Sequence, residues 1–440
     1  MLLPPPKLLS SLSSQDRDDI LISILNQDQI GLMWQEKIRR YICYHNRNLL
    51  KASKLRFKND YLSHLEWMRD IFLLLSQKSL AHNNLKYDSS ILNAAFIADD
   101  ACPGKKSKRQ ELDFLLQILI QHLKNAESVL PTAISETKAF NFNIQNLKSK
   151  FNEIPPITIF SPSHYSLFTL STIKLLLALN MKIDSIVFLN FSYQRFRSEL
   201  YRDGLSLFAK RVWRKLILKA DENKDQSKIG LKSFYQAINK DNKDLLKFAR
   251  LNQIEIFQVN RFNDYIKQTQ SPNGSFCIFT GGGLIDKELL DYFTNGVLNI
   301  HMGSLPQYKG MDVVEAPILD GCFDAVALTS HLMKEQLDAG PVIQEIKFNS
   351  DNYHSLGMLR NEMSAFMPIL AVDSAIKVLK GDLNPCPQVE GGKQYYFIHK
   401  RLRDALSEVL KFRNKYKNLH PINREKNLDL YTSVVEDFCK

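Results

Sequence analysis

GVLNIH, residues 296–301, is an apolar run that ends in an amide and an imidazole. The loop MGSLPQYKG follows it at 302–310, and a carboxylate comes later, in LDAG at 337–340. The run has the length and apolar character of a strand buried on both faces of a sheet. Asn299 and His301 therefore stand at the mouth of a predicted strand, where an α/β sheet binds its ligands.

The same pattern recurs on both sides of this run. Apolar segments of strand length are predicted at 157–161, 185–191, 254–259, 276–280, 297–301 and 326–332. Amphipathic segments between them predict helices at 166–180, 234–249, 286–293 and 313–319, with Asp286 as an N-cap. This alternation indicates a doubly wound, mostly parallel α/β sheet covered by helices on both faces. Its ligand edge would carry Asn299, His301 and the glycine-rich loop 280–283.

Three regions are expected along the chain of 440 residues. Residues 1–150 contain only two glycines, Gly31 and Gly104, and their apolar side chains show helical spacing. This pattern predicts a mainly helical domain of unknown role. Residues 151–380 hold the α/β series and end in a long predicted helix at 353–380. Residues 381–440 are expected to form a β segment at 393–399 and a basic helix at 400–417 that pack on the α/β domain or extend it.

Composition limits the cellular setting and the partners. The net charge of +11 suits an anionic partner, such as a phosphorylated metabolite or RNA, and equally suits a basic solvated surface. The six cysteines form no Cys-x-x-Cys pair, so no zinc or redox motif is indicated and a reducing compartment fits. The N-terminus lacks the basic region of a signal peptide, and Lys174 interrupts the longest apolar run. A cytoplasmic protein without a membrane span is expected.

Asn299, His301 and Asp338 have the chemistry of an acyl-transfer site. An amide N–H donates to a developing oxyanion. An imidazole moves a proton or stabilises nearby negative charge, and a carboxylate beside it fixes its orientation. Because no Ser or Cys stands in a nucleophile elbow, direct transfer to an incoming nucleophile is favoured over a covalent enzyme intermediate.

The motifs around these residues resemble those of the 10-formyltetrahydrofolate-dependent formyltransferases. NIH at 299–301 and LPQYKG at 305–310 resemble the first signature, N-[IV]-H and then L-P-x-aromatic-[KR]-G. TSH at 329–331 and LDAG at 337–340 resemble the second, T-x-H and then D-[AT]-G. The resemblance is strongest over 275–348 and extends from 155 onwards. It implies a formyltransferase-like Rossmann-type fold and an enzyme of one-carbon transfer.

The resemblance also implies a role for each residue. Asn299 would hold the formyl oxygen as the tetrahedral intermediate forms, and His301 would protonate or stabilise that oxyanion. Asp338 would tune His301 and order a water that carries a proton. The implied donor is 10-formyltetrahydrofolate, and no metal is implied. The implied pterin pocket is formed by backbone at Gly283, Leu284, Ile285, Glu335, Gln336 and Leu337.

The acceptor is less well defined, because the chain departs from the family pattern there. The loop SPSHY at 161–165 lacks the small Gly-Ser pattern, and MGS at 302–304 shifts the family's serine by one position. Too little chain follows residue 380 for the C-terminal barrel of the tRNA enzyme. The interpretation is an N-formyltransferase for a small anionic amine, first of all an amino-sugar nucleotide. Formylation of methionyl-tRNA, hydrolysis of the donor and a non-enzymatic folate-binding scaffold are the alternatives. The oligomeric state is not predicted.

Overall fold

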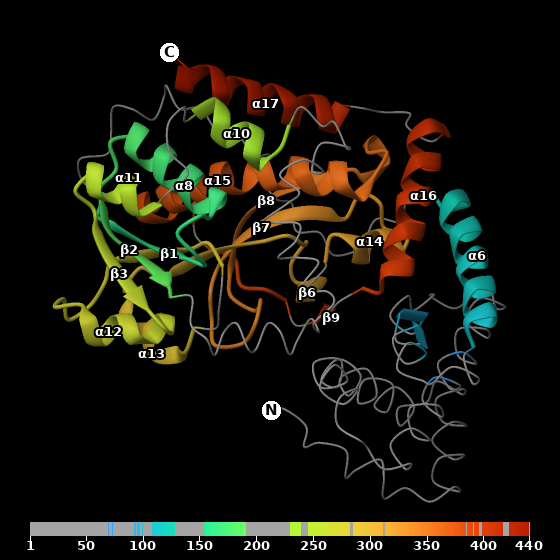
Figure 1. Ribbon diagram of the computed structural model, residues 1–440, viewed down its shortest axis with the longest axis horizontal. Helices are drawn as coiled ribbons and strands as arrows, with labels where there is room; N and C mark the ends of the chain where they lie inside the picture. The colour runs from blue at the N-terminus through green and yellow to red at the C-terminus, as the bar shows by residue number, and fades with distance from the viewer. Residues whose placement is uncertain are drawn as a thin grey trace, which may run out of the picture.

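The computed structural model describes residues 108–127, 154–190, 229–238, 245–281, 285–310, 313–383, 385–389, 391–395, 398–416 and 422–439, with Arg69, Leu73, Leu92, Asn93, Ala95, Phe96 and Asp99 (Figure 1). Most of the helical domain predicted for residues 1–150 lies outside the described residues. The predicted boundaries of the three regions therefore stay a prediction.

A seven-stranded sheet forms the centre, in the order β3-β2-β1-β4-β5-β7-β8. The strands are β1 (Ile157–Ser161), β2 (Ile183–Leu189), β3 (Glu255–Val259), β4 (Phe276–Phe279), β5 (Val297–His301), β7 (Val326–Leu332) and β8 (Val342–Phe348). The first five pair in parallel, while β7 and β8 run antiparallel to their neighbours. The predicted doubly wound, mostly parallel sheet is confirmed.

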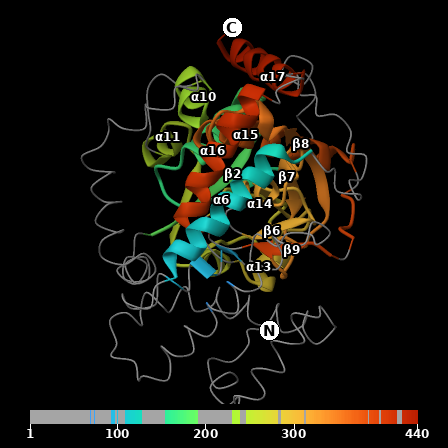
Figure 2. The same ribbon diagram turned by 90° about the vertical axis from the view of Figure 1, so that its right-hand side faces the viewer.

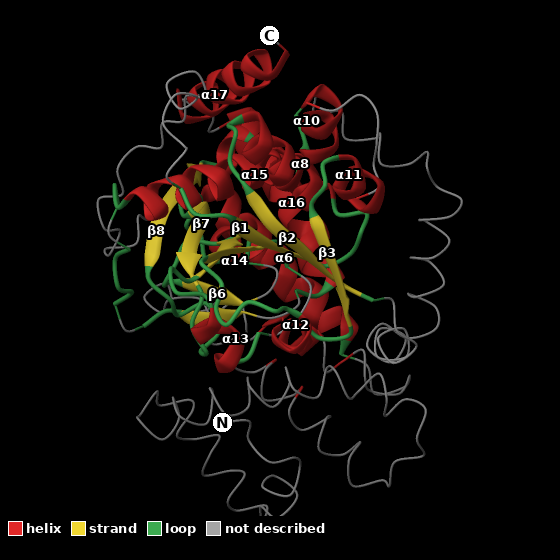
Figure 3. Ribbon diagram, turned by 90° about the vertical axis from the view of Figure 1, so that its left-hand side faces the viewer, coloured by secondary structure: helices red, strands yellow, loops and turns green. Residues whose placement is uncertain are grey.

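Helices cover both faces of the sheet (Figures 1 and 3). On one face lie α8 (Leu167–Ala178), α10 (Leu231–Ile238), α15 (Leu356–Lys380) and, further out, α17 (Ile422–Cys439). On the other lie η2 (Phe262–Asp264), α12 (Tyr265–Gln268) and α13 (Lys287–Tyr292). Two hydrophobic core clusters contain residues from these strands. Ile159 and Leu298 belong to the larger cluster, and their chain neighbours Phe160 and Val297 belong to the second. Strands buried on both faces explain why their sequences are continuously apolar.

Two helix predictions need correction. The single helix predicted at 234–249 is α10 and α11 (Leu245–Leu251), and residues 239–244 between them lie outside the described residues. Asp286 does occupy the N-cap position of α13, but its side chain makes no capping hydrogen bond. Its backbone carbonyl accepts from Leu289 and Leu290 instead.

The sequence did not predict β8, β6 (Tyr308–Gly310) or α17. In β8 two consecutive polar residues, Gln344 and Glu345, are both buried, so the strand shows neither an apolar run nor a polar–apolar alternation. The short strand β6 pairs in parallel with β9 (Lys393–Tyr395) in a separate two-stranded sheet. Between β6 and β7 lies the short helix α14 (Glu315–Leu319). Within the described ranges, no helix has the length and apolarity to cross a bilayer.

At one end of the molecule α6 (Arg109–Asn125) packs along α16 (Lys400–Tyr416), and Figure 2 shows the two helices side by side. Arg413 of α16 is 2% exposed and joins the elements that meet there. Its guanidinium donates to both carboxylate oxygens of Asp351, over 2.6 and 2.8 Å. It also donates to the carbonyl oxygens of Leu123 and Ala126, at the C-terminal end of α6, over 3.0 and 2.7 Å.

Candidate active site

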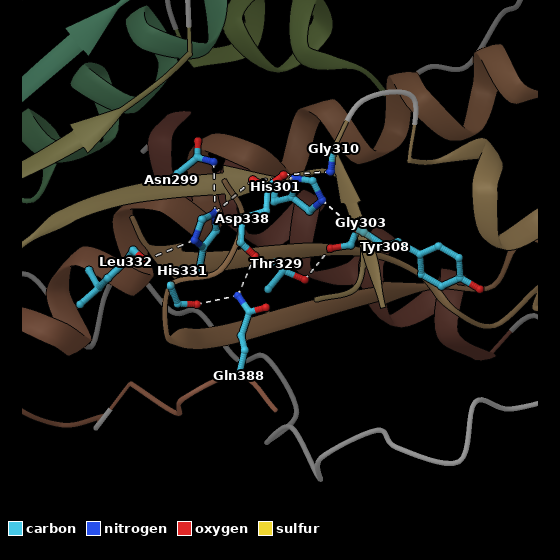
Figure 4. A network of polar contacts seen from close by, with 11 residues as sticks. Asn299, His301, Gly303, Tyr308, Gly310, Thr329, His331, Leu332, Asp338 and Gln388 are labelled. Atoms are coloured by element: carbon cyan, nitrogen blue, oxygen red, sulfur yellow. Dashed lines mark hydrogen bonds and ion pairs between the residues drawn. The ribbon is translucent and has the colours of Figure 1, made fainter. Parts of the chain in front are cut away.

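The pairing of β5 with β7 builds the centre of the site (Figure 4). Asn299 lies opposite His331, and His301 lies opposite Thr329. Residues directly opposite in an antiparallel pair share a face of the sheet, as do residues two apart in one strand. The side chains of Asn299, His301 and His331 therefore gather on one face at the carboxyl end of β5.

His331 is held in one neutral form. Its Nδ1 lies 3.3 Å from the carbonyl oxygen of Leu332, which can only accept, so Nδ1 carries the hydrogen. Nε2 then accepts from Nδ2 of Asn299 over 3.2 Å. Burial, and then the nearby His301, lower the pKa of His331 to about 4, against a smaller opposing effect of Asp338. The neutral ring fixes which way the Asn299 amide points and leaves that amide's second N–H to donate to a ligand.

His301 has partners for both of its ring nitrogens. Nε2 donates to the carbonyl oxygen of Tyr308 over 2.8 Å. Nδ1 faces Oδ1 of Asp338 at 3.6 Å, and both side chains are buried. The ring is therefore held in place from two sides, and a proton on Nδ1 is paired with a carboxylate.

Asp338 sits in a turn with an unusual backbone. Its φ is +51°, a left-handed conformation that Asp tolerates better than most residues. Oδ2 accepts the backbone N–H of Gly310 over 2.9 Å, while Oδ1 faces His301 and lies 3.9 Å from Nε2 of His331. One carboxylate thus connects the loop before α14 with both histidines.

The absence of a side chain at Gly303 leaves room for the hydrogen bond between His301 and Tyr308. A Cβ at this position would lie 2.8 Å from the carbonyl oxygen of Tyr308 and 2.9 Å from Nε2 of His301, which are the two atoms of that bond. A Cβ would therefore force one or both of these atoms to shift. This gives a physical reason for the serine shifted by one position: Ser304 stands one residue further on and is buried.

Ser304 pairs with a buried acid. His301, Thr329 and Glu345 form one row across β5, β7 and β8. Burial raises the pKa of Glu345, and hydrogen bonds with the hydroxyls of Ser304 and Thr329 oppose this rise. The Thr329 hydroxyl also donates to the carbonyl oxygen of Gly303 over 2.7 Å, which joins this row to the loop that follows β5.

The residues predicted for the folate pocket differ in burial, and two of them lie outside the described residues. Gly283 and Leu284 lie outside the described residues. Ile285 is partly buried against the second core cluster. Glu335, Gln336 and Leu337 are exposed in the loop before Asp338, with Leu337 53% exposed. These three exposed residues lie next to the buried carboxylate of Asp338 in the sequence.

The loop expected to contact the acceptor divides into an inner and an outer part. Ser161 is fully buried and shares a chain of hydroxyls with Thr169 and Thr280, with oxygens 2.8 and 2.7 Å apart. Tyr165 is 63% exposed, and its ring centre lies 4.0 Å from that of His164. The ring of Tyr165, rather than the first serine, is the exposed group of this loop.

The sequence brought forward Asn299, His301 and Asp338, and the structure brings all three together. The sequence did not predict two hydrogen-bond donors to the Asp338 loop, the backbone N–H of Gly310 and the side chain of Gln388. Neither has a local signal, because both contacts depend on the path of distant segments. In chemical terms the site offers an oriented amide N–H, a fixed imidazole and a buried carboxylate, a set that stabilises charge on an acyl oxygen.

The family model described as formyl transferase matches residues 258–371. The methionyl-tRNA formyltransferase of Bacillus pumilus is 29% identical over 142 residues, 32% of this chain and 44% of that protein. That of Borrelia garinii subsp. bavariensis is 30% identical over 107 residues, 24% of this chain and 33% of that protein. The chain thus spans less than half the length of these curated relatives.

Among solved structures, the chain is similar to an N-formyltransferase from Helicobacter canadensis in complex with folinic acid and dTDP-3-aminofucose. The TM-score is 0.36 at 14% identity, over 59% of this chain and 81% of that one.

Proposed function

We propose that this chain, whose residues 258–371 belong to the formyl transferase family, moves a formyl group from 10-formyltetrahydrofolate to a primary amine. The convergence of Asn299, His301 and Asp338 at the end of β5 carries the proposal (Figure 4). These are the residue types that direct acyl transfer needs, in contacts that leave one N–H of Asn299 for the formyl oxygen.

Each of the three side chains has its own part in the proposed reaction. As the amine attacks the formyl carbon, the Asn299 amide donates to the oxygen that gains negative charge. His301, whose two ring nitrogens contact Tyr308 and Asp338, stabilises the negative charge on that oxygen. Asp338 holds that ring and orders a water that carries the amine proton toward the leaving nitrogen. The new carbon–nitrogen bond replaces the donor's, so atoms and charge balance.

The loop before Asp338 suits the donor. Glu335, Gln336 and Leu337 are exposed beside the buried carboxylate, which supports their predicted contact with the pterin ring. Leu337 adds an exposed apolar side chain at the same place. A flat heteroaromatic ring binds well where backbone donors and acceptors adjoin apolar surface.

For the acceptor we favour a small anionic amine, and first an amino-sugar nucleotide. The net charge of +11 suits an anionic ligand. The exposed ring of Tyr165, backed by His164, offers a surface on which a nucleobase can stack.

Methionyl-tRNA is the second candidate acceptor. The curated relatives described above are named methionyl-tRNA formyltransferases, and the positive charge of the chain suits RNA as well as nucleotides. Their matches cover 44% and 33% of those proteins, so the acceptor does not follow from the likeness.

One assay separates these possibilities. The full chain is incubated with 10-formyltetrahydrofolate and, in parallel, with a panel of amino-sugar nucleotides, with methionyl-tRNA, with a cell metabolite extract or with no amine. Mass spectrometry looks for a product heavier by one formyl group. A formylated product in any amine arm, lost in Asn299→Ala, supports the proposal. Formate released without an amine identifies a donor hydrolase, and a donor that stays formylated in all arms contradicts formyl transfer.

A cytoplasmic location belongs to the same proposal. Of the described cysteines, Cys277 and Cys386 are free thiols, which suits a reducing compartment. Fractionation of cells that express the tagged full chain tests this, and recovery in the membrane fraction contradicts it.

A further inference from the structure

After α15 the chain returns across the site as an extended segment, residues 385–395, here called the strap. Its residue 390 lies outside the described residues. Near the start of the strap, the backbone of Cys386 exchanges two hydrogen bonds of 2.8 and 2.7 Å with Val342 at the start of β8. It ends with β9, which pairs with β6. The whole strap lies beyond the region matched by the family model, residues 258–371.

Gln388, in the middle of the strap, clamps the loop that carries Asp338 (Figure 4). Its side-chain nitrogen donates to the carbonyl oxygens of Asp338, over 3.0 Å, and Gly340, over 2.6 Å. The two carbonyls flank a turn whose first residue has a φ of +51°. A left-handed residue other than glycine costs on the order of 1 kcal/mol and persists only where neighbouring contacts hold it. Gln388 supplies such contacts at the catalytic carboxylate.

The end of the strap fixes the other catalytic loop. In the register of β6 with β9, Gly310 lies opposite Tyr395. Tyr395 donates its hydroxyl to Oδ2 of Asp320 over 2.6 Å, which anchors β9 behind the site. Gly392 allows the close approach, because a Cβ there would lie 1.6 Å from the carbonyl oxygen of Pro306. The strap therefore follows the loop whose Tyr308 carbonyl oxygen accepts from His301.

These two attachments meet at one hydrogen bond. The backbone N–H of Gly310 donates to Oδ2 of Asp338 over 2.9 Å. Its donor belongs to the loop paired with β9, and its acceptor belongs to the loop held by Gln388. We infer that the strap sets the relative position of these loops, and that Gln388 is the positioning residue for Asp338. The inference deepens the proposed formyl transfer and rests on it.

Two variants remove the clamp in different ways, and one neighbour serves as a control. Gln388→Leu loses both donors without adding charge, and Gln388→Glu keeps the shape but places a carboxylate against two carbonyls. Val389→Thr changes an adjacent strap residue whose side chain is 76% exposed. With 10-formyltetrahydrofolate and the amine formylated in the assay above, we expect kcat to fall about 10- to 100-fold in both clamp variants. KM for the donor should stay within about threefold, because an interaction made mainly in the transition state is lost.

A second readout does not depend on activity. Hydrogen exchange by mass spectrometry follows the amide protons of peptides that cover 305–310 and 333–340 in the full chain. Both peptides should exchange faster in the clamp variants than in wild type and in Val389→Thr, because Gly310 loses its fixed acceptor. Unchanged exchange with kcat within about twofold of wild type overturns the inference, and so does faster exchange without a fall in kcat. If the wild-type chain formylates no amine, the proposed function fails, and the exchange result alone decides whether Gln388 holds the two loops.

Discussion

Asn299 and His331 face each other across β5 and β7, with Nδ2 of the amide 3.2 Å from Nε2 of the ring. Because Nδ1 of His331 donates to a backbone carbonyl, the ring must accept from the amide at Nε2. The tautomer of one residue therefore fixes the orientation of the other. An amide oriented before the ligand arrives loses little energy when it binds a developing oxyanion.

Removing this donor should slow the chemical step. We expect Asn299→Ala to lower kcat for formyl transfer by about 100- to 1,000-fold, as for a single lost oxyanion donor. Steady-state kinetics with saturating donor measures the effect. Asn295→Ala, an exposed asparagine just before the same strand, should leave kcat unchanged. Equal losses in both variants would show that the effect is not specific to the site.

Neutral His331 should make stability depend on pH. Burial lowers its pKa from 6.5 to about 4, so between these values the unfolded chain binds more protons than the folded one. The contribution of this group to stability is complete above the unfolded pKa and is lost as the pH falls. The free energy of unfolding should decrease by up to about 1.4 kcal/mol per pH unit in this window. Urea unfolding at several pH values measures it. His331→Gln should lack this part of the slope, and His354→Gln, at an exposed position, should keep it.

Glu345 should act in the opposite direction. Burial raises its pKa above the usual 4.5, so the folded chain retains a proton that the unfolded chain releases. Its contribution is therefore lost as the pH rises from 4.5 through the folded pKa. Glu345→Gln stays neutral, and its stability relative to wild type should increase over that range. The same urea series measures this, with Glu288→Gln, at an exposed position of α13, as the control. A difference from wild type that is constant with pH would mean that the carboxyl group is not neutral when folded.

A side chain at position 303 should damage the site more than the fold. In Gly303→Ala the new Cβ meets Tyr308 O and His301 Nε2 at 2.8 and 2.9 Å, and Val313 Cγ2 at 2.9 Å, so the groups around the His301 ring must shift. We expect kcat to fall about 10- to 100-fold, with a loss of about 1 to 3 kcal/mol in the free energy of unfolding. Kinetics and urea unfolding measure the two effects. Gly230→Ala, whose Cβ would find ordinary contacts at 3.7 and 3.8 Å, is the control and should change neither.

The junction of α6 and α16 should depend on one buried charge pair. Arg413→Met leaves the buried Asp351 without its guanidinium partner, and we expect a loss of about 3 to 5 kcal/mol in the free energy of unfolding. Arg401→Met, on the same helix, breaks an exposed pair with Asp113 and should cost about 1 kcal/mol or less. Similar losses in the two variants, measured by urea unfolding, would contradict the role given to Arg413.

Patterns within short segments made much of this structure predictable. The apolar run 296–298 predicted β5, and its length placed Asn299 and His301 at the end of that strand. Contacts between distant segments were not predictable in this way. The pairing of Asn299 with His331 follows from strand register, and Gln388 reaches Asp338 from 50 residues away. The strand β8 was missed because Gln344 and Glu345 are buried polar residues whose partners come from other elements.

The contacts of Arg413 also bear on the order in which parts of the chain fold during synthesis. A ribosome makes α6 early, but the guanidinium that binds its last carbonyls is 290 and 287 residues further along. Domains fold as they emerge, and contacts between segments far apart in the sequence form late. The last carbonyls of α6 therefore gain these two donors only after α16 has been synthesised. Nascent chains that stop before α16 should be open at this junction and accessible to chaperones and proteases.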